Sequence, residues 1–387
     1  MQHPWLLQRY LILALLFVLP LLEAYTEEEK FLGSIWQNWW RQDMADPYLG
    51  TLFNQVTPEN VGKWGPVQRD GEDYWNWGRL DAMMEYAADR HMIVKQHAFI
   101  WGHAHSVPNW VDNDNAAWAA ERWIKAFADR YPGIHLIDVV NEAPHDKPPY
   151  RDGLGGDGES GWDWVIWSYA KARKHAPNAT LILNDYDVLK RDSVMHTMIE
   201  IVNLLQKSDL IDGIGCQAHF LEGTSVDAVR QRLDTLYEST GLPVYISEFD
   251  LNISNDTTHR NKFRELFALF WEHPAVRGVT LWGHVEGTMW REHGWLVSSE
   301  GEERLAMTWL KDYLAQMPSA ASNPSPANGA ILENANQVAL QWQHGSAATH
   351  RKVYLSTSPA LGEEDLLAHQ YDLQLVHSDL LPGTTYY

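Results

Sequence analysis

The chain has 387 residues, 45% of them hydrophobic, which is enough to build one large domain and something smaller. Its formal net charge of −21 argues against nucleic acid or an anionic membrane as a partner, because both bind through basic patches. The only cysteine is Cys216, so the sequence excludes an intramolecular disulfide and a cysteine-based metal site.

The first 24 residues have the form of a secretory signal peptide. Arg9 precedes an apolar stretch, Leu11–Leu22, and a small residue, Ala24, stands at the expected cleavage position. The stretch is shorter than the roughly 20 apolar residues that cross a bilayer. No cysteine follows it to carry a lipid anchor. We therefore expect a secreted or periplasmic protein with no membrane partner after cleavage, with an uncleaved anchor as the alternative.

Residues 25–316 alternate between short apolar runs and amphipathic segments. The apolar runs are Phe31–Trp36, Thr51–Val56, Met92–Trp101, Ile134–Asn141, Thr180–Asn184, Ile211–His219, Val244–Glu248 and Gly278–Gly283. The amphipathic segments include Leu80–Arg90, Ala116–Tyr131, Trp162–His175, Val226–Thr240 and Thr258–Glu272. Strand–helix alternation every ~35 residues indicates βαβ units, and eight such units favour closure into a barrel. We predict an α/β fold, a (β/α)8 TIM barrel.

The composition changes after the barrel. Residues 317–328 are rich in Pro, Ser and Ala, which is typical of a linker. Residues 329–387 then show β patterning, and the expected strands are Val338–Trp342, Arg351–Ser356, Leu373–Ser378 and Thr384–Tyr387. This segment resembles the start of a fibronectin-type-III-like sandwich, which needs about seven strands. We expect a partial domain, truncated at the end of the given sequence.

Two apolar runs end in a carboxylate. The run Ile134–Val140 stops at Asn141 and Glu142, and the run Pro243–Phe249 contains Glu248 near its end. One such ending could be a solvated carboxylate at a strand terminus. Two at the C-terminal ends of barrel strands, where catalytic groups of this fold lie, are the pair that hydrolysis of a glycosidic bond requires.

The residues around both carboxylates are similar to those of a known family. The segments Asp138–Glu142 (D-V-V-N-E) and Ile246–Asp250 (I-S-E-F-D) resemble the acid/base and nucleophile signatures of glycoside hydrolase family 10, the endo-1,4-β-xylanases. The resemblance extends from about Phe31 to Leu314, and Gly155–Trp164 is typical of one bacterial branch. It implies a retaining endo-1,4-β-xylanase acting on xylan or xylo-oligosaccharide, with Glu142 as acid/base, Glu248 as nucleophile and no cofactor.

The resemblance also implies which side chains contact the substrate. These residues are Glu59, Asn60, Lys63, His97, Trp101, Asn141, Tyr186, Gln217, His219, Trp282 and Trp290. Asp138 and Asp250 are implied in supporting roles behind them. The segment Thr57–Trp64, which holds three of these residues, is also a plausible helix start, with Thr57 as N-cap and Pro58 as the first helical residue.

The chain departs from the family pattern beside Trp101. Gly102 stands where the family often has histidine, and neither His103 nor His105 can be assigned a role in its place. Eighteen histidines invite a metal hypothesis, but the sequence contains no H-E-x-x-H motif, so we expect no metal site. The alternatives left open are a retaining β-glycanase of another specificity and a non-catalytic polysaccharide-binding protein. The presence of both carboxylates disfavours the second.

The two carboxylates should differ in protonation. A second negative charge nearby raises the pKa of a carboxyl, so we expect ionised Glu248 to raise the pKa of Glu142. Glu248 must itself stay ionised, and the candidates for the hydrogen-bond donors that keep it so are His219 and Asn141.

Overall fold

The computed structural model describes residues 30–37, 46–316, 322–327, 329–332, 337–343, 351–358, 365–370, 374–378, 380–381 and 383–387. The predicted signal peptide, residues 1–24, lies outside the described residues. Two compact units are distinguished, one of residues 1–254 and 265–295 and the other of residues 255–264 and 296–387. In the described part of the chain, no helix has the length and apolar character needed to cross a membrane.

The first unit contains a closed barrel of eight parallel strands, joined in sequence order. The strands are β1 (Phe31–Trp36), β2 (Gln55–Pro58), β3 (Ile93–Ile100), β4 (Leu136–Asn141), β5 (Thr180–Asp185), β6 (Gly213–Cys216), β7 (Val244–Phe249) and β8 (Val276–Leu281). All six residues of β4 and of β7 are buried, as expected for parallel strands covered on both faces. The structure confirms the predicted α/β barrel.

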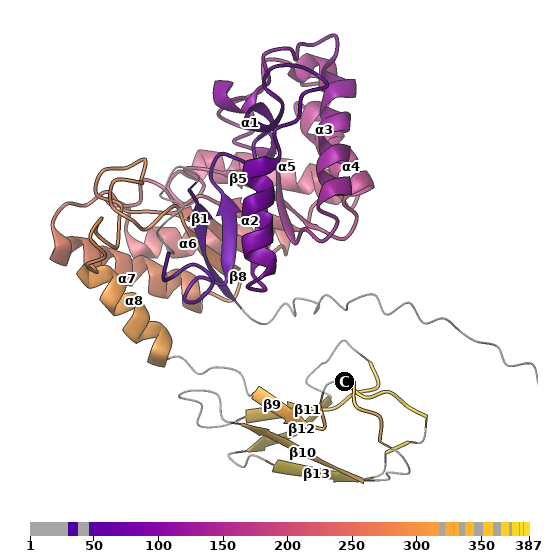
Figure 1. Cartoon of the computed structure of the whole chain (residues 1–387), viewed down its shortest axis with the longest axis vertical. Coiled ribbons are helices and arrows are strands. Elements are labelled where there is room, and N and C mark those ends of the chain that lie inside the picture. Colours follow the sequence, from indigo (N-terminus) through magenta and orange to yellow (C-terminus); the bar gives the residue numbers. More distant parts are fainter. Residues whose placement is uncertain are drawn as a thin grey trace, which may run out of the picture. The chain divides into compact units, whose positions relative to one another are not determined.

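Helices alternate with the barrel strands along the chain (Figure 1). They are α1 (Trp64–Gln68), α2 (Gly78–Ala88), α3 (Ala116–Arg130), α4 (Asp163–His175), α5 (Asp192–Gln206), α6 (Val226–Thr240), α7 (Asp256–Glu272) and α8 (Leu305–Gln316). Helix α6 shows how local sequence sets the ends. The Ser225 hydroxyl accepts a hydrogen bond from the Ala228 N–H at 3.2 Å, and Gly241 ends the helix with a φ of +68°.

The second strand differs from its prediction. The apolar run Thr51–Val56 predicts a strand that starts at Thr51. The observed strand starts later, because Gly50 (φ +81°) and the hydrogen bond from Phe53 N–H to the Tyr48 carbonyl (2.9 Å) form a turn first. Strand β2 begins at Gln55 and includes Thr57 and Pro58. The alternative helix start at Thr57 is therefore wrong, since the next helix begins at Trp64.

Inside the barrel, one end is apolar and the other polar. Phe31, Leu136, Ile182 and Tyr245 form a buried cluster, in which the rings of Phe31 and Tyr245 stack at 6.0 Å. Pairing shifts in register near the C-terminal ends of β3, β4 and β7. Such irregularities redirect side chains at strand ends. They occur at the strands that carry the candidate catalytic residues.

The second unit contains two small antiparallel sheets. Strands β9 (Ser322–Ser325), β10 (Gln337–Gln343) and β13 (Gln374–Ser378) form one sheet in the order β13-β10-β9. The other sheet pairs β11 (Arg351–Tyr354) with β12 (Leu366–Gln370). Strand β9 lies within the segment 317–328 that composition predicts to be a linker. The boundary near residue 316 stays a prediction.

Candidate active site

The barrel brings Glu142 and Glu248 into one hydrogen-bonded network. Glu248 lies on β7, and Glu142 follows β4 with a φ of +57°, in the left-handed region where the strand stops. Asn184, on β5, donates from Nδ2 to Oε1 of Glu248 at 2.7 Å and to Oδ1 of Asn141 at 2.9 Å. Asn141 in turn donates to Oε1 of Glu142 at 3.3 Å. The two carboxylates predicted from separate strands are therefore linked through two amides.

Glu248 is buried among cationic groups. His219 Nε2 lies 3.3 Å from its Oε2, and His97 Nδ1 lies 3.9 Å from its Oε1. Burial opposes the charged form, but the His219 hydrogen bond and the charges of His97, His219 and Lys95 outweigh it and lower the pKa of Glu248 to about 2. His219 was a predicted donor. The other donor is Asn184, so the expectation that Asn141 holds Glu248 is wrong.

His219 is held between two carboxylates. Its Nδ1 lies 3.1 Å from Oδ2 of Asp250, which also accepts from Trp290 Nε1 at 2.7 Å. Arg291 Nη1 lies 2.8 Å from the other Asp250 oxygen. Burial opposes the charged imidazole, but Asp250 and Glu248 raise the pKa of His219 to about 10. The positive charge beside Glu248 is therefore maintained over the whole neutral pH range.

Glu142 has the opposite electrostatic environment. Burial, the largest effect, raises its pKa to about 7, and the charges of Glu248 and Asp185 act in the same direction. Gln217 Nε2 donates to Oε1 at 3.0 Å and Trp101 Nε1 to Oε2 at 3.1 Å, and both bonds favour the carboxylate. The expected coupling to Glu248 is present, but burial contributes more than the neighbouring charge. One carboxyl is thus ionised and the other is partly protonated near neutral pH.

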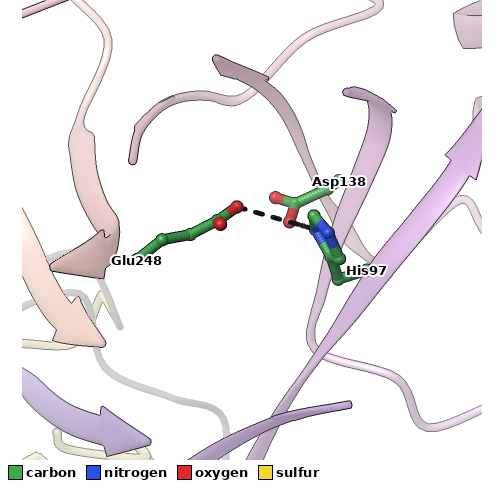
Figure 2. A group of neighbouring side chains, drawn as sticks. All are labelled: His97, Asp138 and Glu248. Atoms are coloured by element: carbon green, nitrogen blue, oxygen red, sulfur yellow. Dashed lines mark hydrogen bonds and ion pairs between the residues drawn. The ribbon is translucent and has the colours of Figure 1, made fainter. Parts of the chain in front are cut away.

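Glu248 belongs to a group of three buried side chains that have the residue types of a metal site. Figure 2 shows His97 and Asp138 opposite Glu248, with His97 Nδ1 2.9 Å from Oδ2 of Asp138. The same oxygen accepts from Lys95 Nζ at 2.7 Å, and both Lys95 and Asp138 are fully buried. A metal cation bound there would face this ammonium, so the residues fit an internal ion pair better. The absence of a metal stays a prediction.

The residues predicted to bind sugar on the nucleophile's side gather around Lys63. Its Nζ donates to Oδ1 of Asn60 at 2.9 Å and lies 4.7 Å from the centre of the Trp101 ring. Burial lowers the pKa of Lys63 to about 8, against the opposing charges of Glu248, Glu59 and Glu142. The structure therefore places this cation near both candidate catalytic carboxylates, and Glu59 near Glu248.

Aromatic rings border the carboxylates. Trp282 is buried, with its ring edge-on to His97 at 5.2 Å. Trp290 is 52% exposed and its ring lies 4.9 Å from that of His219. His103 stacks on Trp101 at 4.9 Å. His105, the other histidine to which the sequence assigns no role, lies in the short helix Ala104–Ser106. Its carbonyl oxygen accepts a hydrogen bond from the Arg69 side chain.

Several contributing residues were absent from the predicted site. Asn184 was not among the predicted residues, although it lies near the C-terminal end of a barrel strand and could have been found by that rule. Lys95 lies in the middle of β3, where sequence offers no signal for a buried partner 43 residues away. His145 lies in a loop after β4, with Nδ1 2.7 Å from Oδ1 of Asp185.

Comparisons with known proteins agree with this geometry. Endo-1,4-beta-xylanase B of Cellvibrio japonicus (strain Ueda107) is 38% identical over 271 residues, covering 68% of this chain and 43% of the relative. Endo-1,4-beta-xylanase 2 of Arabidopsis thaliana is 31% identical over 272 residues, covering 67% of this chain and 24% of the relative. The chain thus spans less than half the length of these two relatives.

Solved structures share the fold. The crystal structure of native xylanase 10B from Thermotoga maritima matches with a TM-score of 0.65 at 22% identity, covering 74% of this chain and 95% of that one. That of endo-1,4-beta-xylanase from Caldicellulosiruptor owensensis matches with a TM-score of 0.63 at 24% identity, covering 73% and 96%. The sequence profile of glycosyl hydrolase family 10 matches residues 21–313, which is most of the chain. With the carboxylate pair at the strand ends of a closed barrel, this match shows that the chain belongs to glycosyl hydrolase family 10.

Proposed function

We propose that this protein is a retaining endo-1,4-β-xylanase. The observation that carries the proposal is the pair of buried carboxyls linked through Asn184 and Asn141, of which Glu248 alone has the His219 imidazole 3.3 Å away. These surroundings lower the pKa of Glu248 and raise that of Glu142. A nucleophile must be ionised while a general acid must hold a proton, and this pair meets both conditions in weakly acidic solution.

In the first step, Glu248 attacks the anomeric carbon while Glu142 protonates the departing sugar oxygen. A glycosyl-enzyme ester forms, and Glu248 loses its negative charge. Because that charge helps to raise the pKa of Glu142, esterification favours the ionised Glu142. Glu142 then takes a proton from water, and the resulting attack on the ester releases the product with its original anomeric configuration.

The proposed substrate is xylan or a xylo-oligosaccharide. Support comes from the names of the relatives, which are endo-1,4-beta-xylanases, and from the polar cluster of Lys63, Asn60 and Glu59 that can bind sugar hydroxyls beside Glu248. A β-glycanase of another specificity uses the same carboxylate chemistry, so a comparison of rates on different polysaccharides distinguishes it from a xylanase. The non-catalytic alternative is disfavoured because both carboxylates are held in working protonation states.

We also propose that the protein is exported, to the periplasm or the medium, with residues 1–24 removed. The pattern of a charged start followed by an apolar run supports this. The C-terminal residues are proposed to be part of a fibronectin-type-III-like domain. Their arrangement as two antiparallel sheets, with β10 central in the larger one, supports a β-sandwich fold.

The test is release of reducing ends from xylan, mixed-linkage β-glucan and cellulose. We expect xylan to be hydrolysed fastest, and Glu142→Gln and Glu248→Gln variants to be inactive on it. Faster hydrolysis of either glucan would reassign the substrate. No hydrolysis of any of the three by the wild type would refute the enzymatic function.

A further inference from the structure

A histidine that sequence reasoning did not identify lies next to the candidate general acid. His145 Nδ1 lies 2.7 Å from Oδ1 of Asp185, which is fully buried. The same oxygen accepts from the Tyr186 backbone N–H at 2.7 Å. The rings of His145 and Tyr186 stack at 3.9 Å with an angle of 25° between their planes. Asp185 therefore fixes both the position of the imidazole and the backbone of the residue on which it stacks.

The loop that carries His145 packs against Gly102. Gly102 N–H donates to the Asp146 carbonyl at 3.1 Å, and a Cβ at Gly102 would lie 2.2 Å from the same oxygen. Any larger residue at position 102 would displace this loop. Glycine at position 102, after the end of β3 at Ile100, thus allows the loop after β4 to approach closely and to bring in His145.

The loop is also tied to the general acid. The Glu142 carbonyl accepts hydrogen bonds from the N–H groups of His145 (3.0 Å) and Asp146 (2.8 Å). Glu142 is the group that protonates the oxygen leaving with the departing sugar. Side chains of this loop, which is bonded to Glu142 through its backbone, therefore lie on the side of the departing sugar.

The Nε2 atom of His145 is available to bind a ligand. Nδ1 faces the Asp185 carboxylate and so carries a proton, and one ring face is covered by Tyr186. Nε2 has no hydrogen-bond partner among the described residues, and the side chain is 19% exposed. Burial lowers the pKa of His145, but Asp185 and Glu142 outweigh it and raise the pKa overall, which keeps Nε2 a hydrogen-bond donor at mildly acidic pH.

We propose that His145 is a specificity-determining residue on the leaving-group side: its Nε2 binds a hydroxyl of the departing sugar, and its ring holds Tyr186 beside that sugar. The proposal rests on the xylanase function proposed above and names a contact within the same site. This contact should distinguish a sugar leaving group from an aryl leaving group, because an aryl group has no hydroxyl for Nε2 to bind.

The experiment compares two substrates with the full chain. Xylotetraose has a sugar as its leaving group, and 4-nitrophenyl β-xylobioside has an aryl group in its place. We expect His145→Ala to lower kcat/KM by about tenfold or more on xylotetraose, as for the loss of one hydrogen bond to a charged group, and by less than about threefold on the aryl glycoside. His145→Phe keeps an aromatic ring to stack on Tyr186 but has no nitrogen, so it should show the same selective loss.

His175→Ala is the matched control. This histidine, on α4, has a 13% exposed side chain with Nε2 3.2 Å from Glu121, a carboxylate outside the site. It should leave both substrates unchanged. Equal loss on both substrates for His145→Phe, or no loss on xylotetraose, would overturn the inference. A wild type that hydrolyses neither substrate would instead contradict the proposed function, so the two failures are distinguishable.

Discussion

The most direct test of the proposed mechanism is the pKa of Glu142 in a Glu248→Gln variant. This substitution removes a negative charge and keeps the shape of the side chain. Because that charge is one of the effects that raise the pKa of Glu142, the pKa should fall. The total rise is from 4.5 to about 7, or 7 − 4.5 = 2.5 pH units, and burial is its largest cause. Burial persists in the variant, so we expect a fall of about one pH unit, worth ~1.4 kcal/mol.

The pKa is measured by NMR titration of the Glu142 carboxyl carbon in wild type and variant. Glu121→Gln is the control, since Glu121 is ion-paired with Lys171 and Lys174 on the helical surface and should leave the Glu142 titration unchanged. An unchanged pKa in Glu248→Gln would mean that the two carboxyls are not coupled. The exchange of roles between the two steps would then have no electrostatic basis. A fall to 4.5 would mean that charge, not burial, sets the pKa.

Four further outcomes are expected. The value of kcat/KM for xylan should decline as the pH rises through about 7, where Glu142 loses its proton. It should also decline as the pH falls toward about 2, where Glu248 gains a proton. An alkaline limit well above 7 would contradict the assignment of Glu142. His219→Phe removes the main donor to Glu248, so the acidic limit should move to higher pH by at least one unit, measured from the same profiles; an unmoved limit would exclude His219 from this role. Glu142→Ala should keep a burst of nitrophenol from activated aryl xylosides, which need no proton, whereas Glu248→Ala should give none; equal loss in both would refute the division of roles. A chain ending at Gln316 should fold and hydrolyse xylan as the full chain does, by circular dichroism and reducing-end assay; loss of folding would contradict the predicted boundary.

The polar end of the barrel shows why part of the site could be predicted. Glu142 and Glu248 each follow or end a buried apolar run, so their position at the mouth of a barrel depends only on where strands stop. The same rule applies to Asn184 and Asp185, which end β5. These residues differ from the Lys95–Asp138 pair, which joins the interior of two strands and follows from their register.

The sequence by itself determined the barrel and the two candidate catalytic carboxylates, because apolar periodicity and strand ends are local properties of the chain. The side chains around the carboxylates were implied by the resemblance of its motifs to those of a known family. Tertiary structure alone decided what those groups touch. Register shifts between strands place Glu248 against Asn184 and not against Asn141. Burial depends on the whole fold, and it raises the pKa of Glu142 more than the charge of Glu248 does. The place of His145 depends on close packing between two loops at Gly102, a contact between backbones that no pattern of side chains encodes.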